Sequence, residues 1–141
     1  MARIKKLVVD SSVVVKWLNS QDEKYLRQAD EILKDCERGK VALYAPQLAK
    51  YEVGNAILNK GLNEAQAKIS LATLYSLPIS FLALSEKEAA KSLKIASDAG
   101  ITYYDAVFIS LAEDVGATLV TDNPKHQKLV GKVKIVELKN Y

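Results

Sequence analysis

Residue types that build disulfides and zinc sites are scarce in this sequence. Its 141 residues include one cysteine, Cys36, and one histidine, His126. A lone cysteine excludes a disulfide within the chain and agrees with a reducing compartment. Because zinc sites usually draw three or four ligands from cysteine, histidine and acidic residues, the same scarcity argues against zinc.

Long apolar runs and linker-like segments are also missing. The apolar stretch near the N-terminus is interrupted by Asp10 and then by Lys16, so it predicts neither a signal peptide nor a membrane span. We find no internal repeat and no dividing segment rich in proline, glycine and serine. We therefore expect one domain over residues 1–141, in the cytoplasm and without a membrane contact.

The overall composition is that of an ordinary globular protein. Hydrophobic residues make up 49% and charged residues 26% of the chain. The net charge of +3 is compatible with a nucleic-acid partner, but it is too small to argue for one.

Alternating apolar and amphipathic segments predict an α/β fold. Strands are expected at 4–9, 41–45, 79–84, 117–121 and 133–138, the last of them at a sheet edge. Helices are expected between most strands, so the central five-stranded sheet should be mostly parallel and covered on both faces, in three α/β/α layers.

Capping residues mark where several helices begin. We expect Asp22 to cap a helix ending near residue 37, and Pro46 to lie in the first turn of a helix reaching about residue 60. Three further caps are expected at Asn63, Ser85 and Thr102. A short helical turn is expected at 125–129. The helix after Asn63 is expected to face the core with the following residues: Ala65, Ile69, Ala72 and Leu74 or Tyr75.

Four acidic residues occupy positions where chemistry is common. Asp10 ends the first predicted strand, and Asp122 directly follows the fourth. Asp105 opens an apolar helix, and Glu52 lies in the second turn of the helix after Pro46. Since strand ends and the first turns of the following helices share one edge of a parallel sheet, these acids should meet there.

Each acid also has a purely structural interpretation. Asp10 or Ser11 would cap the following helix, and Asp105 would be the acid of a capping box. Asp122 would be a turn residue, and Glu52 would lie at the margin of an amphipathic helix. Convergence of the four on one edge is what favours function.

Clustered carboxylates need neutralisation by protons or cations. An all-oxygen site without a histidine or cysteine cluster suits Mg²⁺ or Mn²⁺. Such a site is suited to hydrolysis of phosphodiesters, because the metal activates water and stabilises the leaving oxygen.

Four segments, taken in order, resemble the signature of the PIN-domain family, and within it the VapC-type toxin ribonucleases of toxin–antitoxin systems. The segments are residues 8–13 (VVDSSV), 51–56 (YEVGNA), 103–106 (YYDA) and 119–123 (LVTDN). The resemblance implies a cytoplasmic Mg²⁺-dependent endoribonuclease. It also implies an RNA substrate, a homodimer, and a VapB-like antitoxin whose C-terminal segment enters the active-site groove.

The resemblance also assigns roles to individual residues. Asp10, Glu52 and Asp105 would be three members of an acidic quartet, with Asp10 and Asp105 as the main metal ligands. Ser12 and Thr121 would support the acids.

One position departs from the family pattern. The family commonly has Thr-x-Asp at the fourth segment, whereas here Asn123 takes the third place and Asp122 the middle one. Neighbouring residues of an extended segment point in opposite directions, so one of the two fills the fourth position. We predict Asp122 as the fourth catalytic acid.

The hypothesis that follows is metal-assisted hydrolysis of RNA. Glu52 would orient or deprotonate the attacking water, and Asp122 or Asn123 would hold a second metal or a bridging water. Candidate phosphate contacts, left unranked, are Lys16, Lys50, Lys125 and Lys128. Candidate base-stacking residues are Tyr51, Tyr103 and Tyr104, although tyrosines at helical spacing are more often core residues. His126 is expected at the surface.

Two rival functions remain open. One is a phosphotransfer domain of the haloacid-dehalogenase or receiver type that uses Asp10, although Ser12 stands where the former usually has a second Asp. The other is a non-catalytic RNA-binding protein with a PIN fold. Phosphatase, nuclease and binding assays distinguish the three.

Overall fold

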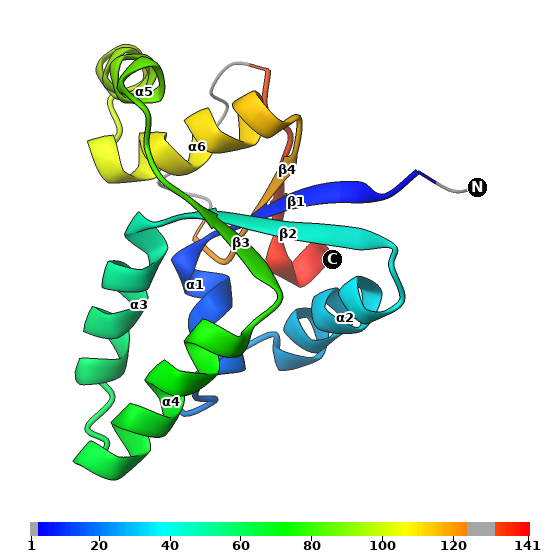
Figure 1. The fold of residues 1–141 in the computed structure, drawn as a ribbon, viewed down its shortest axis with the longest axis vertical. Helices are drawn as coiled ribbons and strands as arrows, with labels where there is room; N and C mark the ends of the chain where they lie inside the picture. The colour runs from blue at the N-terminus through cyan, green and yellow to red at the C-terminus, as the bar shows by residue number, and fades with distance from the viewer. Residues whose placement is uncertain (1–2, 124–131) are drawn as a thin grey trace.

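The structure of the chain is a computed structural model that describes residues 3–123 and 132–141. A five-stranded sheet in the order β3-β2-β1-β4-β5 runs through its centre (Figure 1). Its strands are β1 (Lys5–Val9), β2 (Val41–Pro46), β3 (Ile79–Leu82), β4 (Thr118–Thr121) and β5 (Ile135–Glu137). All four neighbouring pairs are parallel, which confirms the predicted central sheet.

Helices cover both faces of this sheet. Helices α5 and α6 lie over one face, and α1 to α4 lie over the other (Figure 1). The helices are α1 (Ser11–Val14), η1 (Val15–Trp17), α2 (Leu26–Glu37), α3 (Leu48–Leu58), α4 (Glu64–Ser76), α5 (Glu86–Ala99), α6 (Tyr103–Val115) and η3 (Leu138–Asn140). The α/β/α arrangement predicted from the sequence is confirmed.

The core is built around β1 and α6. Leu7, Val8 and Val9 are fully buried, as expected for a central parallel strand with both faces covered. In α6, every residue from Ala106 to Ala112 is buried, which explains why this helix is apolar nearly all round.

Three of the four predicted caps are confirmed. The side chains of Asn63, Ser85 and Thr102 each accept a hydrogen bond from the backbone N–H three residues later. At the other end of α6, Gly116 has φ +71°, a left-handed conformation that costs glycine little.

The predictions for Asp22 and Pro46 were wrong. Helix α2 begins at Leu26, because Asp22 and Tyr25 both have positive φ values of 60° and 59° and turn the chain before it. Pro46 is the last residue of β2, where it pairs with Leu82, and it does not open α3. The fixed φ of proline suits an extended strand end as well as a first helical turn, so the residue type alone does not decide.

The inward face predicted for α4 was also mostly wrong. Leu74 is buried as expected, and Ala67 and Ser70 share its side of the helix. The following expected core residues are exposed instead: Ala65, Ile69, Ala72 and Tyr75. Apolar residues occur on two sides of this helix, so the pattern does not single out the face that meets the protein.

The C-terminal strand is confirmed in its position at the sheet edge, although it is shorter than the predicted 133–138. Leu138 is fully buried in η3, beyond the strand. The helical turn predicted at 125–129 lies outside the described residues. Within the described ranges, no helix is both long and apolar enough to cross a membrane.

Candidate active site

The carboxyl ends of β1 and β4 place Asp10 and Asp122 side by side. The two strands are parallel neighbours, with Val9 opposite Val120. The backbone N–H of Asp10 donates to the carbonyl of Val120 at 3.0 Å, which extends the pairing by one residue. Both acids therefore leave the sheet at the same edge, as the sequence predicted.

Two hydroxyl groups fix the carboxylate of Asp10. Asp10 occupies the N-cap position of α1, but its side chain makes no capping hydrogen bond. Its Oδ2 atom instead accepts hydrogen bonds from Ser12 Oγ at 2.8 Å and from Thr121 Oγ1 at 2.9 Å. The interpretation of Asp10 as a mere helix cap is therefore wrong for its side chain.

The same hydroxyls also hold the turn after β4. Ser12 Oγ accepts from the backbone N–H of Asp122 at 3.0 Å, and Thr121 Oγ1 accepts from that of Asn123 at 2.9 Å. Each hydroxyl thus donates to Asp10 and accepts from the turn. The position of Asp10 and the path of residues 121–123 depend on each other.

Glu52 reaches this edge from the second turn of α3. Ser11 Oγ donates to Glu52 Oε1 at 2.8 Å. Burial raises the pKa of Glu52, and the negative charges of Asp10 and Asp105 raise it further, whereas the Ser11 hydrogen bond acts in the opposite direction. Asp10 and Asp105 are therefore both close enough to Glu52 for their charges to act on it, so the structure brings these acids to one region.

Asp105 lies in the first turn of α6. Its backbone N–H donates to Thr102 Oγ1 at 3.1 Å, so the main chain of this residue takes part in the helix cap. Its half-buried carboxylate also acts on Glu52, which a cap alone does not explain. Asp105 thus joins the helix cap through its main chain, and its carboxylate acts on the acidic edge.

The donor chemistry of this edge fits a hard divalent cation. In the part of the chain that the structure describes, no group of three or more histidine, cysteine or acidic residues is arranged to hold a metal by itself. Mg²⁺, however, typically takes one or two carboxylates and completes its shell with water and substrate phosphate. Asp10 and Asp105 are the carboxylates that would hold such an ion here, and the negative charges around Glu52 would favour its binding.

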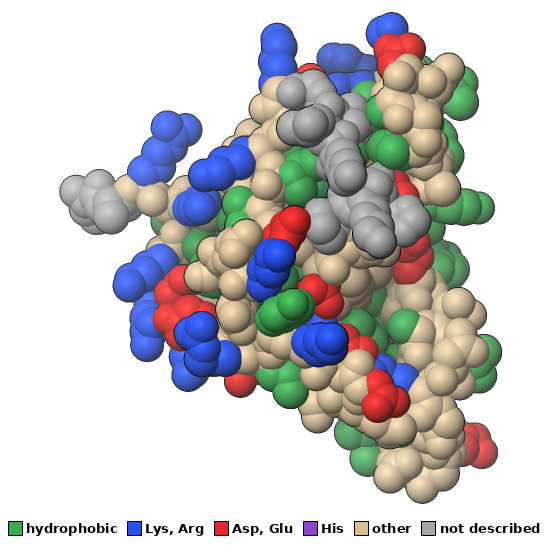
Figure 2. Space-filling view, turned by 180° about the vertical axis from the view of Figure 1, so that it is seen from behind, with side chains coloured by type: hydrophobic (Ala, Val, Ile, Leu, Met, Phe, Trp, Pro, Cys, Tyr) green, Lys and Arg blue, Asp and Glu red, His purple; other side chains and the backbone are tan. Residues whose placement is uncertain are grey.

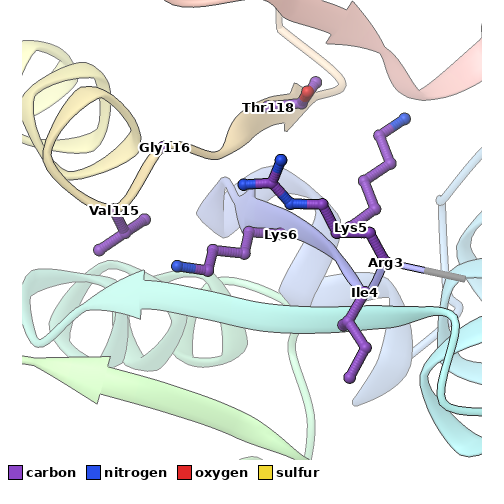
Figure 3. A pocket seen from close by; sticks show the side chains of 7 residues that line it. All are labelled: Arg3, Ile4, Lys5, Lys6, Val115, Gly116 and Thr118. Atoms are coloured by element: carbon purple, nitrogen blue, oxygen red, sulfur yellow. The ribbon is translucent and has the colours of Figure 1, made fainter. Parts of the chain in front are cut away.

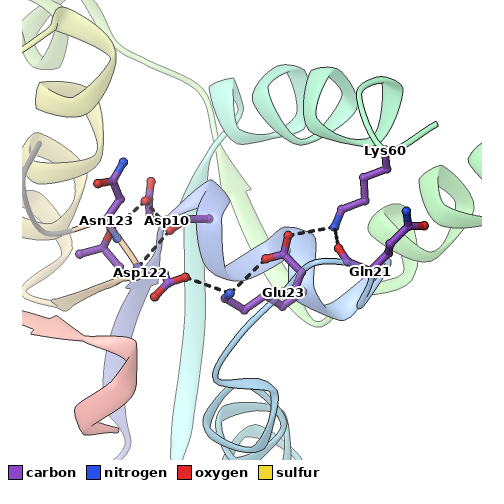
Figure 4. A network of polar contacts seen from close by, with 9 residues as sticks. Asp10, Gln21, Glu23, Lys60, Asp122 and Asn123 are labelled. Atoms are coloured by element: carbon purple, nitrogen blue, oxygen red, sulfur yellow. Dashed lines mark hydrogen bonds and ion pairs between the residues drawn. The ribbon is translucent and has the colours of Figure 1, made fainter. Parts of the chain in front are cut away.

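A buried lysine adjoins this site. The Lys16 side chain is 1% exposed, and its Nζ lies 2.9 Å from Asp122 Oδ2 and 3.0 Å from Glu23 Oε1 (Figure 4). Lys60 Nζ lies 2.9 Å from the other Glu23 oxygen and also donates to the carbonyl of Gln21. Burial alone would raise the pKa of Glu23, but the hydrogen bonds and charges of Lys60 and Lys16 outweigh it and lower that pKa.

The sequence had suggested Lys16 as a phosphate contact and missed its buried ion pairs. One signal was available: Lys16 interrupts the apolar run 13–18, and a lysine facing inward needs carboxylate partners. The hydrogen bond from Ser11 to Glu52 was missed as well, because it joins residues 41 positions apart.

The other suggested nucleic-acid contacts are dispersed. Lys50 lies over the rings of Tyr75 and Phe81, 4.8 Å from each centroid. All three suggested stacking tyrosines are exposed, namely Tyr51, Tyr103 and Tyr104. Lys125, His126 and Lys128 lie outside the described residues.

A separate hollow of about 410 Å³ lies at the opposite end of the sheet (Figure 3). It is lined by Arg3, Lys5 and Lys6 together with residues around the start of β4. In Figure 2, basic side chains are prominent around the N-terminal end of the chain. Because its lining contains no acid, this hollow is not part of the carboxylate site.

Comparison with known proteins identifies the family. The family model of the PIN domain matches residues 7–132, which is most of the chain. Ribonuclease VapC3 of Pyrobaculum aerophilum is 31% identical over 124 residues, covering 82% of this chain and 88% of that protein.

Solved structures agree on the fold. VapBC2 of Rickettsia felis, bound to a promoter DNA fragment, has a chain that matches with a TM-score of 0.69 at 17% identity, covering 94% of this chain and 98% of that one. DNA-bound VapBC of Salmonella typhimurium matches with a TM-score of 0.69 at 14% identity, covering 96% and 99%. The chain therefore belongs to the PIN-domain family, and within that family it is VapC-like.

Proposed function

We propose that this protein is a divalent-metal-dependent endoribonuclease and the toxin of a toxin–antitoxin pair. The observation that carries the proposal is the edge where hydroxyl-fixed Asp10 and the carboxyl groups of Glu52 and Asp105 act on one another. The similarity to a protein named Ribonuclease VapC3 supports RNA as the substrate.

In the proposed mechanism, Asp10 and Asp105 hold Mg²⁺ or Mn²⁺. When bound, that ion supplies a Lewis acid for the scissile phosphodiester. Glu52 orients the attacking water and accepts its proton. The raised pKa of Glu52 makes it a stronger base than an ordinary glutamate, while the hydrogen bond from Ser11 fixes one of its oxygens. Asp122, predicted from the sequence as the fourth acid, is paired with Lys16 and holds no metal in this mechanism.

The test is RNA cleavage by the purified protein with Mg²⁺ or Mn²⁺, beside Asp10→Asn, Asp105→Asn and a chelator control. We expect metal-dependent cutting that both substitutions reduce at least about a hundredfold, since each removes a charged metal ligand. Cutting that persists in both variants would contradict the assignment. Turnover of p-nitrophenyl phosphate without RNA cleavage would favour the phosphatase alternative.

A pocket that would suit the proposed antitoxin lies on α3 and α6, the helices that carry Glu52 and Asp105. A largely apolar pocket of about 140 Å³ is lined by Leu48, one turn before Glu52, and by Tyr104, next to Asp105. An apolar side chain from the C-terminal segment of a VapB-like antitoxin fits this pocket and blocks the edge. We expect Leu48→Asp to weaken inhibition by the co-expressed antitoxin; unchanged inhibition would contradict this location.

The proposed homodimer uses the outward surfaces of α3 and α4, which pack against each other. Four large side chains on them are strongly exposed: Tyr51 at 77%, Leu58 at 76%, Ile69 at 67% and Tyr75 at 69%. Several large apolar side chains exposed on neighbouring helices of a small protein mark an interface, and a second copy presents the same side chains to them. Light scattering should give a dimer for the wild type and a monomer for Ile69→Glu; a monomeric wild type would refute it.

A further inference from the structure

The buried network around Lys16 is balanced in charge. Two cations, Lys16 and Lys60, are joined through Glu23, and Lys16 also pairs with Asp122 (Figure 4). Removing an ammonium group from water is costly unless carboxylates compensate it, and the side chain of Lys16 is 1% exposed with two of them. Asp122 therefore has a fixed counter-ion supplied by the chain itself.

The neighbouring acids differ in this respect. Within residues 3–123 and 132–141, neither Asp10 nor Glu52 forms an ion pair with a lysine or arginine. Their partners are the hydroxyl groups of Ser11, Ser12 and Thr121, which orient carboxylates without neutralising them. A bound cation would therefore be stabilised near Asp10 and Glu52, whose charges the chain leaves uncompensated within the described residues.

We propose that Lys16 is a positioning residue that holds the carboxylate of Asp122 away from the metal ligands and supplies the positive charge a second divalent ion would otherwise bring. This inference rests on the proposed nuclease site and deepens it. The site then binds one divalent ion, near Asp10 and Asp105. Asp122 contributes through its place in the turn and not as a ligand.

The hydrogen bonds give Lys16 a path to Asp10. Its ion pair fixes Asp122, whose backbone N–H donates to Ser12 Oγ, and Ser12 Oγ donates to Asp10 Oδ2. The backbone step does not require a carboxylate at position 122. An amide there leaves the bond to Ser12 in place, and Lys16 keeps Glu23 as a partner.

The first experiment is calorimetric titration of the RNA-free protein with Mn²⁺. We expect one ion per chain for the wild type and for Asp122→Asn, with dissociation constants within about a factor of three of each other. Asp10→Asn is the comparison that removes a ligand, and it should weaken binding by at least about tenfold. Two ions on the wild type, or a loss in Asp122→Asn as large as in Asp10→Asn, would overturn the proposal.

The second experiment removes the internal charge with Lys16→Met. Asp122 is then released, so we expect a second Mn²⁺ ion, or binding of the first about tenfold tighter. Adding Asp122→Asn to Lys16→Met should abolish that gain. Lys60→Met is the matched control, because it disturbs the same network without touching Asp122 and should leave Mn²⁺ binding unchanged. Equal Mn²⁺ binding by Lys16→Met and the wild type would overturn the proposal.

Metal binding separates this inference from the nuclease assignment. If the wild type binds one Mn²⁺ ion and Lys16→Met binds two but neither cuts RNA, the inference stands and the proposed substrate is wrong. If the wild type cuts RNA with two bound ions, the nuclease stands and the inference is wrong. A wild type that binds no Mn²⁺ refutes both the proposed metal site and the inference.

Discussion

Two groups of acids meet at the turn after β4 and are stabilised in opposite ways. Around Lys16, the carboxylates of Glu23 and Asp122 are paired with buried ammonium groups. Around Asp10, the carboxylates receive hydroxyl hydrogen bonds and repel one another. The pKa shifts reflect this contrast. The pKa of Glu23 is lowered, so its charged form is favoured, whereas the pKa of Glu52 is raised, so its protonated form is favoured.

This contrast separates acids that stabilise the fold from acids available for chemistry. A paired, buried carboxylate contributes to folding and is a poor base, because its proton affinity is reduced. A carboxyl group whose pKa is raised by burial and by like charges destabilises the fold when it is ionised, but it accepts a proton or binds a cation more readily. The sharp turn after β4 joins the two groups, since it carries both Asp122 and the backbone groups bound to Ser12 and Thr121.

The largest expected effect is on activity, from Glu52→Gln. If Glu52 accepts the proton of the attacking water, the RNA cleavage rate at saturating metal should fall by about 10² to 10⁴-fold. Glu64→Gln is the control, since Glu64 is an exposed residue paired with Lys68 on the surface of α4. A cleavage rate for Glu52→Gln equal to that of the control would show that Glu52 is not the base.

The next effect is on stability, from Glu23→Gln. This change removes the carboxylate shared by two largely buried lysines, so the free energy of unfolding at neutral pH should fall by about 3 kcal/mol. Glu31→Gln breaks an exposed pair with Arg38 and should cost less than about 1 kcal/mol. Urea unfolding of the three proteins checks this, and equal losses in both variants would refute the distinction between buried and surface pairs.

A smaller effect is expected from Thr121→Val, which keeps the shape of a fully buried residue and removes its hydroxyl. Asp10 loses one of two donors and the N–H of Asn123 loses its acceptor, so the protein should lose about 1.5 kcal/mol of stability. Thr118→Val, at the start of the same strand, makes no such bonds in the described structure and should change stability by less than about 0.5 kcal/mol. Indistinguishable unfolding curves for the two valine variants would contradict the role of the hydroxyl.

The sequence predicted the sheet edge because strand order and helix starts follow from local patterns. The apolar run ending at Asp10 and the capping residue Thr102 are local signals, and they place Asp10 and Asp105 correctly on the fold. The start of α2 was missed because it depends on two non-glycine residues with positive φ, which no periodicity encodes. The face of α4 was missed because apolar residues occur on both of its sides.

The partners of the site residues could not be predicted in the same way. Ser11 meets Glu52, and Lys16 meets Asp122, across 41 and more than 100 positions of sequence. Such pairs depend on how the elements pack and not on spacing within one element. The sequence placed Lys16 only among four unranked candidates for phosphate contacts, and the buried ion pair with Asp122 was not considered.

The smallest effect is a difference in pH dependence, which tests the contrast through opposite signs. Because the pKa of Glu52 is raised on folding, its ionisation costs stability as pH rises from the unfolded-state pKa through the folded-state pKa. The stability advantage of Glu52→Gln over the wild type should therefore grow as pH rises above about 4.5. Because the pKa of Glu23 is lowered on folding, its contribution to the free energy of unfolding is present above the unfolded-state pKa and is lost as pH falls through the folded-state pKa. The deficit of Glu23→Gln should therefore shrink on acidification. Urea midpoints in metal-free buffer measure both trends. The same sign for both variants would mean that the two groups of acids are not electrostatically distinct.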